Sequence, residues 1–346
     1  MSASDSSYVL VTGGTGFIGS HTVLELVTQG YNVVVADNMY NGCEEPLRRI
    51  EKLANLKDRI PLCKVDLTDK SSLREVFRQY SFSSVVHLAA VKAVGESVRK
   101  PLVYYRNNVT GTLNLLDVMV EFGVKNIVFS SSATVYKADP EGKPFREDSE
   151  LGCTSPYGRT KLFMESIIQD VVNAEQGWNA IMLRFFNPAG AHESGTMGEN
   201  PMQIPNNLMP YMSQVAIGKL EKLHVFGTDF NTRDGTGLRD YIHIMDLAEA
   251  HVAALKRLSA NHGYEVFNIG SGSGQTVLEM IDAMSAACGK KIPYSEDPRR
   301  SGDIDTILCD PTKAAEVLGF KVSRSLEQMC ADLWRWQTAN PSGYGQ

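Results

Sequence analysis

The chain has 346 residues, 43% of them hydrophobic and 21% charged, as in an ordinary soluble globular protein. A net charge of −6 argues against nucleic acid or an anionic membrane as a partner, and it makes a local cationic pocket necessary for any phosphate substrate. No long apolar run could span a membrane, and the polar start Met1–Ser7 is not a secretory signal. Six scattered cysteines predict free thiols in a cytoplasmic protein, and the seven histidines do not cluster as metal ligands.

The first 185 residues alternate short apolar strands with helical patterns. Candidate strands are Tyr8–Thr12, Asn32–Ala36, Ile60–Val65, Ser84–Leu88, Asn126–Ser130 and Ala180–Arg184, and candidate helices lie near 17–29, 46–57, 71–79, 107–122 and 156–174. This alternation predicts an α/β fold with a Rossmann-type, doubly wound parallel sheet that helices cover on both faces.

The first strand opens directly into a glycine-rich turn and a helical pattern. Gly14 is expected to permit the tight turn, Gly16 to let backbone approach a pyrophosphate, and Gly19 to let the helix pack on the strand. The second strand ends in Asp37, 21 positions after Gly16, where an acid binds the adenosine ribose. An Asp repels a 2′-phosphate and no Arg follows at 38–41, so the sequence predicts NAD rather than NADP.

The composition changes after Asn187-Pro188. Loops rich in glycine and proline cover 187–206, and the rest mixes helices (207–218, 244–259, 276–288, 312–318, 325–338) with strands near 223–226 and 265–269. We expect a dinucleotide-binding domain at 1–186 and a smaller mixed α/β substrate lobe at 187–346, with about 243–270 packing back on the first domain. The tail 341–346 is expected to be loose.

Two motifs carry the chemistry. The cluster Ser130-Ser-Ser-Ala-Thr134 begins where the fifth strand ends, at the ligand edge of the sheet. Pro156 suits the start of a helix, which places Tyr157 and Lys161 four residues apart on one face. The ammonium group is expected to lower the pKa of the phenol, so that it can take a proton from an alcohol during oxidation by a nicotinamide.

These motifs resemble the extended short-chain dehydrogenase/reductase superfamily, and further motifs are similar to its UDP-galactose 4-epimerase family. The latter are Lys92–Ser97, Arg184–Pro188, Pro205–Pro210, Gly235–His243 and Arg300–Asp303. The resemblance runs nearly end to end. It implies reversible conversion of UDP-galactose to UDP-glucose in galactose metabolism: C4 is oxidised to a transient ketone, the bound keto sugar rotates, and the opposite face is reduced with NAD held throughout.

The resemblance also implies roles for individual residues. Tyr157 would be the general base, Lys161 its electrostatic partner and Ser132 a hydrogen-bond partner of the same sugar hydroxyl. Cofactor contacts would come from Gly13, Gly16, Phe17, Ile18, Gly19, Asp37, Asn38, Met39, Tyr40, Asn41, Asp66, Leu67, Leu88, Lys92, Lys161 and Phe185. Substrate contacts would come from Ser132, Ala133, Thr134, Phe185, Phe186, Asn187, Asn206, Asn207, Leu208, His224, Val225, Phe226, Arg239, Tyr241, Val277, Arg300, Asp303 and Ile307, with both arginines on the diphosphate.

The sequence departs from the family pattern at two informative places. Lys137 stands where glycine is usual. Ile307 is intermediate between the small residue that admits a 2-N-acetyl sugar and the tyrosine that excludes it, so acceptance of UDP-N-acetylhexosamines stays open.

Three other functions have to be compared with this pattern. A 4,6-dehydratase needs an acid/base pair directly after the strand-end serine, where this chain has Ala133-Thr134. An epimerase of a charged sugar such as UDP-glucuronate would need an added cation in the pocket, which the sequence does not exclude. A silent NAD-sensing or scaffold protein would not need Ser132, Tyr157 and Lys161 together.

Two helices carry more apolar residues than one sheet face needs. They are 107–122, with Val109, Leu113, Leu116, Met119 and Val120, and 162–172, with Phe163, Ile167 and Val171. We predict that they form the four-helix interface of a homodimer.

Overall fold

A computed structural model describes residues 7–201, 204–300 and 303–345, so most of the polar N-terminal segment and Gln346 lie outside the described residues. The chain divides into two compact units. Unit 1 consists of the chain up to Tyr136, Leu151–Arg184 and Ala248–Phe267. Unit 2 consists of Lys137–Glu150, Phe185–Leu247 and the chain from Asn268 onward.

Unit 1 is built on a parallel sheet. Among the described residues, seven strands lie in the order β10-β6-β5-β4-β1-β2-β3. They are β1 (Tyr8–Thr12), β2 (Val33–Asp37), β3 (Leu62–Lys64), β4 (Phe82–His87), β5 (Asn126–Ser130), β6 (Asn179–Phe185) and β10 (Tyr264–Ile269). The predicted Rossmann-type sheet is thus confirmed. The strand order reverses between β1 and β4, and ligands bind at the carboxyl ends of strands beside such a reversal.

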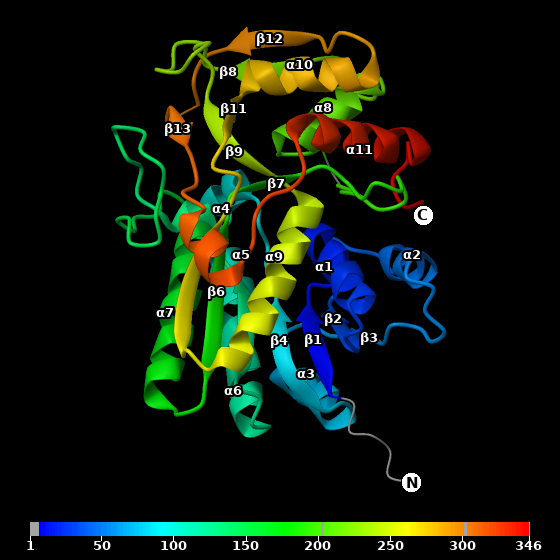
Figure 1. The fold of residues 1–346 in the computed structure, drawn as a ribbon, viewed down its shortest axis with the longest axis vertical. Helices are drawn as coiled ribbons and strands as arrows, with labels where there is room; N and C mark the ends of the chain where they lie inside the picture. Colours follow the sequence, from blue (N-terminus) through cyan, green and yellow to red (C-terminus); the bar gives the residue numbers. More distant parts are fainter. Residues whose placement is uncertain (1–6, 202–203, 301–302, 346) are drawn as a thin grey trace. The chain divides into compact units, whose positions relative to one another are not determined.

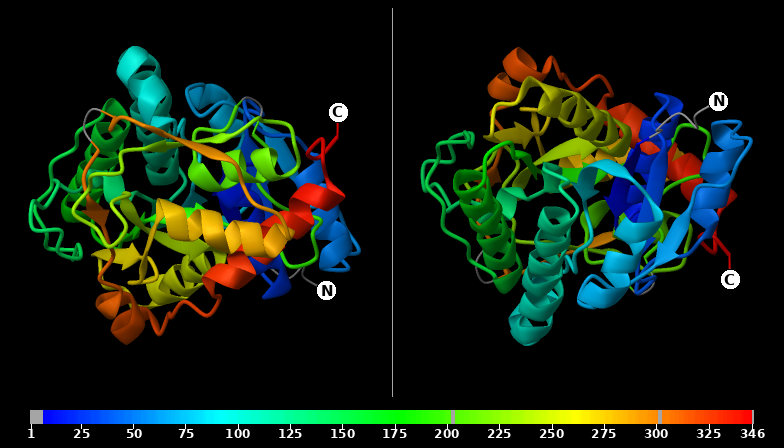
Figure 2. Two further views of the ribbon diagram at one scale, coloured as in Figure 1. Left: turned by 90° about the horizontal axis from the view of Figure 1, so that it is seen from above. Right: turned by 90° about the horizontal axis from the view of Figure 1, so that it is seen from below.

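Helices cover both faces of this sheet (Figures 1 and 2). The helices of unit 1 are α1 (Phe17–Thr28), α2 (Glu45–Leu53), α3 (Lys70–Gln79), α4 (Val94–Arg99), α5 (Pro101–Tyr104), α6 (Gly111–Glu121), α7 (Pro156–Ala174) and α9 (Ile244–Arg257), with the 3₁₀ turns η2 (Ala133–Val135) and η3 (Leu258–Ala260). On one face, α6 packs against both α3 and α7. The strands are buried on both sides because their runs of Val, Ile and Leu face both helix layers.

The predicted helix at 107–122 differs in the structure. A π-helical segment η1 (Tyr105–Thr110) occupies its first turn, and α6 begins only at Gly111. The side chain of Asn108 bonds the backbone of Val91 through both its oxygen (2.9 Å) and its nitrogen (3.1 Å). Apolar periodicity does not reveal a π turn, because the turn shifts the helix by a single residue.

Unit 2 is a mixed lobe around β9 (Leu238–His243), which pairs with β7 (Asn187–Ala189), β11 (Gly274–Thr276) and β13 (Thr306–Ile307). A separate ribbon pairs β8 (Leu223–Phe226) with β12 (Tyr294–Asp297). Its helices are α8 (Leu208–Ala216), α10 (Val277–Cys288) and α11 (Leu326–Ala339), with the π-helical segment η4 (Ala314–Leu318). The expectation of a loose tail is wrong for Tyr344, since its ring packs on Trp336 and its hydroxyl bonds the backbone of Gly198.

Candidate active site

The glycine-rich turn between β1 and α1 leaves no room for a side chain at most of its glycines. Gly13, with a φ of 71°, is the glycine whose conformation the tight turn requires, so assigning that role to Gly14 was wrong. A Cβ at Gly14 would lie 2.7 Å from Val35, and one at Gly19 would lie 2.1 Å from the Gly13 carbonyl oxygen. At Gly16 a Cβ would meet only that same oxygen, at 3.4 Å. The turn therefore offers bare backbone at the start of α1, which suits a bound pyrophosphate.

Asp37 ends β2 beside this turn. Its carboxylate accepts from the Thr15 amide (3.0 Å), the Thr15 hydroxyl (2.7 Å) and the Met39 amide (2.9 Å). Met39 has a φ of 61°, a conformation that few non-glycine residues adopt. Both Thr15 bonds go to Oδ2, whereas Oδ1 accepts only from Met39 and can accept a second hydrogen bond from a ribose hydroxyl.

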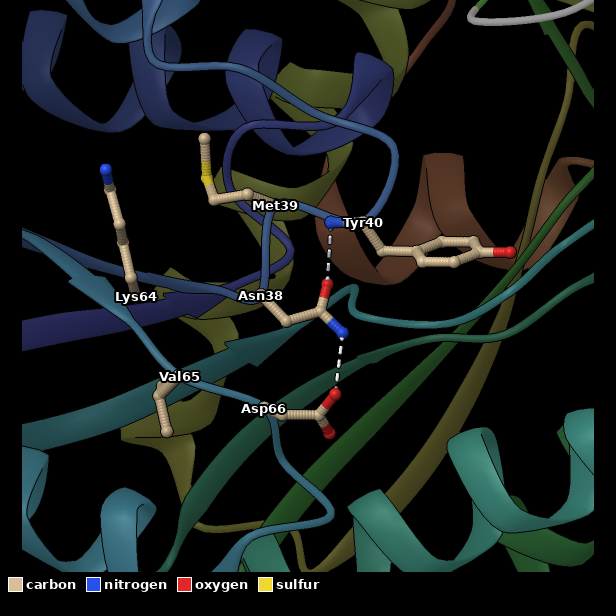
Figure 3. A pocket seen from close by; sticks show the side chains of 6 residues that line it. All are labelled: Asn38, Met39, Tyr40, Lys64, Val65 and Asp66. Carbon is tan, nitrogen blue, oxygen red and sulfur yellow. Dashed lines mark hydrogen bonds between the residues drawn. The ribbon is translucent and has the colours of Figure 1, made fainter.

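A pocket of about 530 Å³ adjoins Asp37 and contains several of the predicted cofactor residues (Figure 3). Its lining consists of Asn38, Met39, Tyr40, Lys64, Val65 and Asp66. The Asn38 amide donates to Asp66 at 2.9 Å, and Tyr40 is 73% exposed. The pocket has the mixed polar and apolar lining that an adenosine needs. Nearby, the ammonium of Lys92 lies 5.9 Å from the ring centroid of Phe17.

The catalytic candidates of unit 1 meet where β5 ends. Ser132 begins the turn η2, and its hydroxyl accepts from the Thr134 amide at 3.2 Å. The helix α7 begins at Pro156 with Ser155 as its cap. The start of α7 approaches η2 closely: a Cβ at Gly158 would lie 2.6 Å from the Thr134 carbonyl oxygen. This approach lets Tyr157 hydrogen-bond Ser132.

Lys161 lies one turn further along α7 and is almost fully buried. Its ammonium donates to the Ser130 carbonyl oxygen at 2.7 Å and lies 4.9 Å from the ring centroid of Phe129. Burial lowers the pKa of Lys161 to about 7, and the carboxylate of Glu165 opposes this shift. The lysine is therefore hydrogen-bonded to the last residue of β5, two residues before Ser132.

The expected lowering of the phenol pKa is wrong for the protein alone. Burial raises the pKa of Tyr157 to about 12, and the hydrogen bond from Ser132 lowers it by less. Desolvation wins because the phenolate would be a buried anion and Lys161 directs its ammonium at a backbone carbonyl. Additional positive charge at the site is needed before Tyr157 can act as a base near neutral pH.

Sequence analysis missed a buried ion pair beneath these residues. The guanidinium of Arg184 binds Glu165 in a fork, with its shortest contact at 2.6 Å. Ser131 also donates to Glu165, and Arg184 donates to the Tyr136 hydroxyl at 3.1 Å. A carboxyl four residues after the lysine, on the same helix face, was the signal that could have revealed the pair.

Unit 2 brings together several of the predicted diphosphate and ribose residues. Arg239 on β9 is half-buried, which lowers its pKa, while the charges of Asp303 and Arg300 act on it. Arg300 pairs with Asp303 at 2.9 Å and lies 5.0 Å from the ring centroid of Phe226. The arginines therefore lie within one charged cluster, as expected of an anion site.

Other predicted substrate residues of unit 2 hold defined positions around this cluster. His224 pairs with Asp297 at 2.5 Å and stacks on Phe226, with ring centroids 6.1 Å apart. Ile307 on β13 stands opposite Arg239 in the strand register. The Asn187 amide donates to the Asp240 carbonyl at 3.0 Å, so this side chain is already bound to β9. Lys137, the departure from the family pattern, pairs with Glu150 at 2.8 Å on the exposed surface.

No helix in the described part of the chain is both long and apolar enough to cross a membrane. All six cysteines are free thiols.

The chain is similar to known proteins over nearly its whole length. It is 52% identical over 344 residues to the UDP-glucose 4-epimerase of Homo sapiens, covering 97% of this chain and 98% of that protein. It is equally identical over 336 residues to the Bacillus subtilis protein of that name, at 97% and 98% coverage. The crystal structure of UDP-glucose 4-epimerase from Bifidobacterium longum in complex with NAD+ and UDP is 46% identical, with a TM-score of 0.93 over 97% of this chain and 100% of that one. A family model described as GDP-mannose 4,6 dehydratase matches residues 10–333.

Proposed function

Because this chain belongs to the extended short-chain dehydrogenase/reductase family, and within it to the UDP-glucose 4-epimerases, we propose that it interconverts UDP-galactose and UDP-glucose with bound NAD. One observation carries the proposal: a chain 52% identical to known epimerases keeps Ser132, Tyr157 and Lys161 together at the carboxyl end of β5. The reaction inverts a secondary alcohol that has no acidic C–H, and this requires transient oxidation.

Bound NAD supplies a reversible two-electron oxidation at C4 of the sugar. Tyr157, as the phenolate, takes the proton of the C4 hydroxyl and later returns it to the reduced sugar. Ser132 holds the same hydroxyl through its own O–H. Lys161 contributes positive charge that favours the phenolate when the lysine is protonated, which its pKa of about 7 permits near neutral pH.

Unit 1 provides the groups for the cofactor. The bare backbone from Gly13 to Gly19 would hold the pyrophosphate, and Asp37 the adenosine ribose. The 530 Å³ pocket would hold the adenine. The remaining cofactor contacts in the proposal are Phe17, Ile18, Asn41, Leu67, Leu88 and Lys92, together with Phe185 of unit 2.

Unit 2 provides the groups for the sugar nucleotide. Arg239 and Arg300 would clamp the diphosphate, Asp303 the uridine ribose, and His224 to Phe226 the uracil. Asn206, Asn207, Leu208, Phe186, Tyr241 and Val277 complete the proposed contacts. Charged protein groups would hold the nucleotide, and only neutral groups would contact the sugar. This arrangement suits a reaction in which the keto sugar must rotate while the nucleotide stays bound.

The dehydratase named by the family model is not favoured for this chain. A 4,6-elimination needs an acid/base pair next to the strand-end serine, and Ala133 and Thr134 form the turn η2 there. Acceptance of 2-N-acetyl sugars depends on Ile307, which is half-buried on β13. We propose a cytoplasmic homodimer as the working state, formed through exposed apolar residues of α6 and α7.

The test is incubation of the purified protein with UDP-galactose and no added NAD. We expect UDP-glucose to form with no net rise in the absorbance of reduced nicotinamide, because the cofactor is regenerated in each turnover. A parallel reaction with UDP-N-acetylgalactosamine tests whether a site with Ile307 accepts a 2-N-acetyl sugar. No product, even with NAD supplied, would contradict the proposal and make charged UDP-sugars the next substrates.

A further inference from the structure

A buried histidine lies beneath the catalytic helix and has no part in the proposed reaction. His87 is the last residue of β4 and only 1% exposed. Its ring lies between two buried hydroxyls, with Nδ1 2.7 Å from Thr12 Oγ1 and Nε2 2.9 Å from Thr112 Oγ1. Thr12 directly precedes the glycine-rich turn, and Thr112 is on α6.

The neighbours fix which ring nitrogen carries the proton. The Thr112 hydroxyl donates to the Asn108 carbonyl (2.8 Å), with Met164 Sδ also within reach, so it must accept from His87 Nε2–H. Thr12 Oγ1 already accepts from the amides of Leu88 and Ala89, at 3.2 Å each, so its own proton goes to Nδ1. Burial and the nearby charge of Lys161 lower the pKa of His87 to about 3, so the ring stays neutral.

The hydrogen bonds continue from this histidine to the catalytic helix. The Asn108 amide donates to Thr160 Oγ1 at 3.0 Å, and that hydroxyl donates to the Tyr157 carbonyl at 2.7 Å. Thr160 lies on α7 between Tyr157 and Lys161, and both it and Asn108 are buried. Asn108 belongs to the π-helical segment η1, a type of turn often found at functional sites.

We propose that His87, as the neutral Nε2–H tautomer, is a positioning residue that holds α7 in register with the glycine-rich turn through Thr112 and Asn108. The chain of buried side chains joins β1, β4, α6, η1 and α7. This proposal rests on the proposed function in one respect. The groups that His87 positions, Tyr157 and Lys161, must be placed to within a fraction of an ångström for their reaction with the substrate hydroxyl.

The kinetic test compares four variants with UDP-galactose as substrate. His87→Phe and Thr112→Val each break the chain, so each should lower kcat by at least about tenfold with KM within about twofold. His87→Gln keeps an N–H for Thr112 and should retain most of kcat. The matched control is Thr22→Val: among the described residues, the hydroxyl of this fully buried threonine has no hydrogen-bond partner, so its loss should leave kcat unchanged.

The double variant separates positioning from general damage. If both residues act through one chain, His87→Phe with Thr112→Val should be little worse than the poorer single variant. Additive losses, or full kcat in a folded His87→Phe, would overturn the proposal. If His87→Phe does not fold, the contrast between His87→Gln and Thr112→Val decides the same question.

A second readout does not need turnover. In the holoenzyme labelled with ¹⁵N-histidine, the signals lost in His87→Gln identify His87, and they should show a bare Nδ1 and a protonated Nε2 from about pH 6 to 8. The other tautomer, or titration in this range, would overturn the proposal. A wild-type protein that does not convert UDP-galactose would instead contradict the proposed function, and the tautomer would still decide the role of His87.

Discussion

Tyr157 and Lys161 deviate from their ordinary pKa values in opposite directions, and one cause acts on both. Burial disfavours the charged form, so it raises the pKa of the phenol and lowers that of the ammonium. Near neutral pH the phenol is therefore uncharged in the protein alone, and the lysine is protonated in only about half of the molecules. A positively charged group bound beside them would favour the phenolate.

Tyr157→Phe removes the proposed base and keeps the ring. We expect turnover of UDP-galactose to fall by at least about 10²-fold, the scale of a lost general base, while NAD stays bound. Tyr294→Phe on β12 serves as a control, because that tyrosine is partly exposed and belongs to unit 2, whereas Tyr157 belongs to unit 1. Turnover close to the wild-type rate would remove Tyr157 from the mechanism.

His87 links stability to pH. The pKa of His87 is about 3 in the folded protein and 6.5 for an ordinary histidine, so between these values the unfolded chain binds a proton that the folded one does not. The free energy of unfolding therefore falls as the pH falls from 6.5 toward 3, by at most about 1.4 kcal/mol per pH unit. The glutamine of His87→Gln does not titrate in this range. Urea unfolding at neutral pH and at about pH 5 should therefore show a smaller decrease in the free energy of unfolding for the variant than for the wild type. Equal losses would contradict the assignment.

At the scale of elements, the close contact between α1 and the turn after β1 depends on the absence of a side chain at Gly19. Gly19→Ala would place a Cβ 2.1 Å from the Gly13 carbonyl oxygen, so the turn or the helix must move. We expect a loss of stability of about 1–3 kcal/mol and less NAD copurifying per chain. The measurement is a thermal melt together with quantification of NAD released on denaturation.

Gly95→Ala is the matched control for that substitution. Gly95 lies in α4, where a Cβ would meet no atom within 4 Å and φ is not positive. The same added methyl group should leave the melt and the NAD content unchanged there. Equal damage at both positions would mean that the contact at Gly19 is not the cause.

Sequence patterns predicted most elements of unit 1 and the helices of unit 2 to within a few residues, but they missed most of the short strands of unit 2, for physical reasons. Runs such as Val33–Ala36 are buried on both faces and identify a strand locally. The two-residue strand β13 exists only because β9, far away in the chain, pairs with it. His87 was missed because a single polar residue ending the apolar run Val85-Val86 belongs to no motif, although its position at a strand end was a usable signal.

At the scale of the whole molecule, the structure narrows the surface proposed for the homodimer. Leu116 and Met119, both assigned to the interface from the sequence, are buried in the core of unit 1 instead. Leu113 and Val120 on α6 and Phe163 on α7 remain exposed. Their exposure supports the proposed interface, since exposed apolar patches mark association sites.

Light scattering at micromolar concentration should give twice the chain mass. Leu113→Glu should shift the protein toward the monomer, because it would bury a charge in the interface. Val317→Glu, which alters an exposed apolar residue of unit 2, should leave the mass unchanged. A monomeric wild type would contradict the proposal.

The position of β10 has a consequence for how the chain is made. This strand completes the sheet of unit 1 next to β6, yet 78 residues separate Phe185, the end of β6, from Tyr264, and most of them belong to unit 2. A nascent chain that has emerged from the ribosome only as far as β6 exposes the edge of an unfinished sheet. It must wait through the synthesis of that insertion before the edge can be covered. Such a wait favours wrong pairing between neighbouring nascent chains, so this fold places a demand on chaperones that a contiguous domain would not.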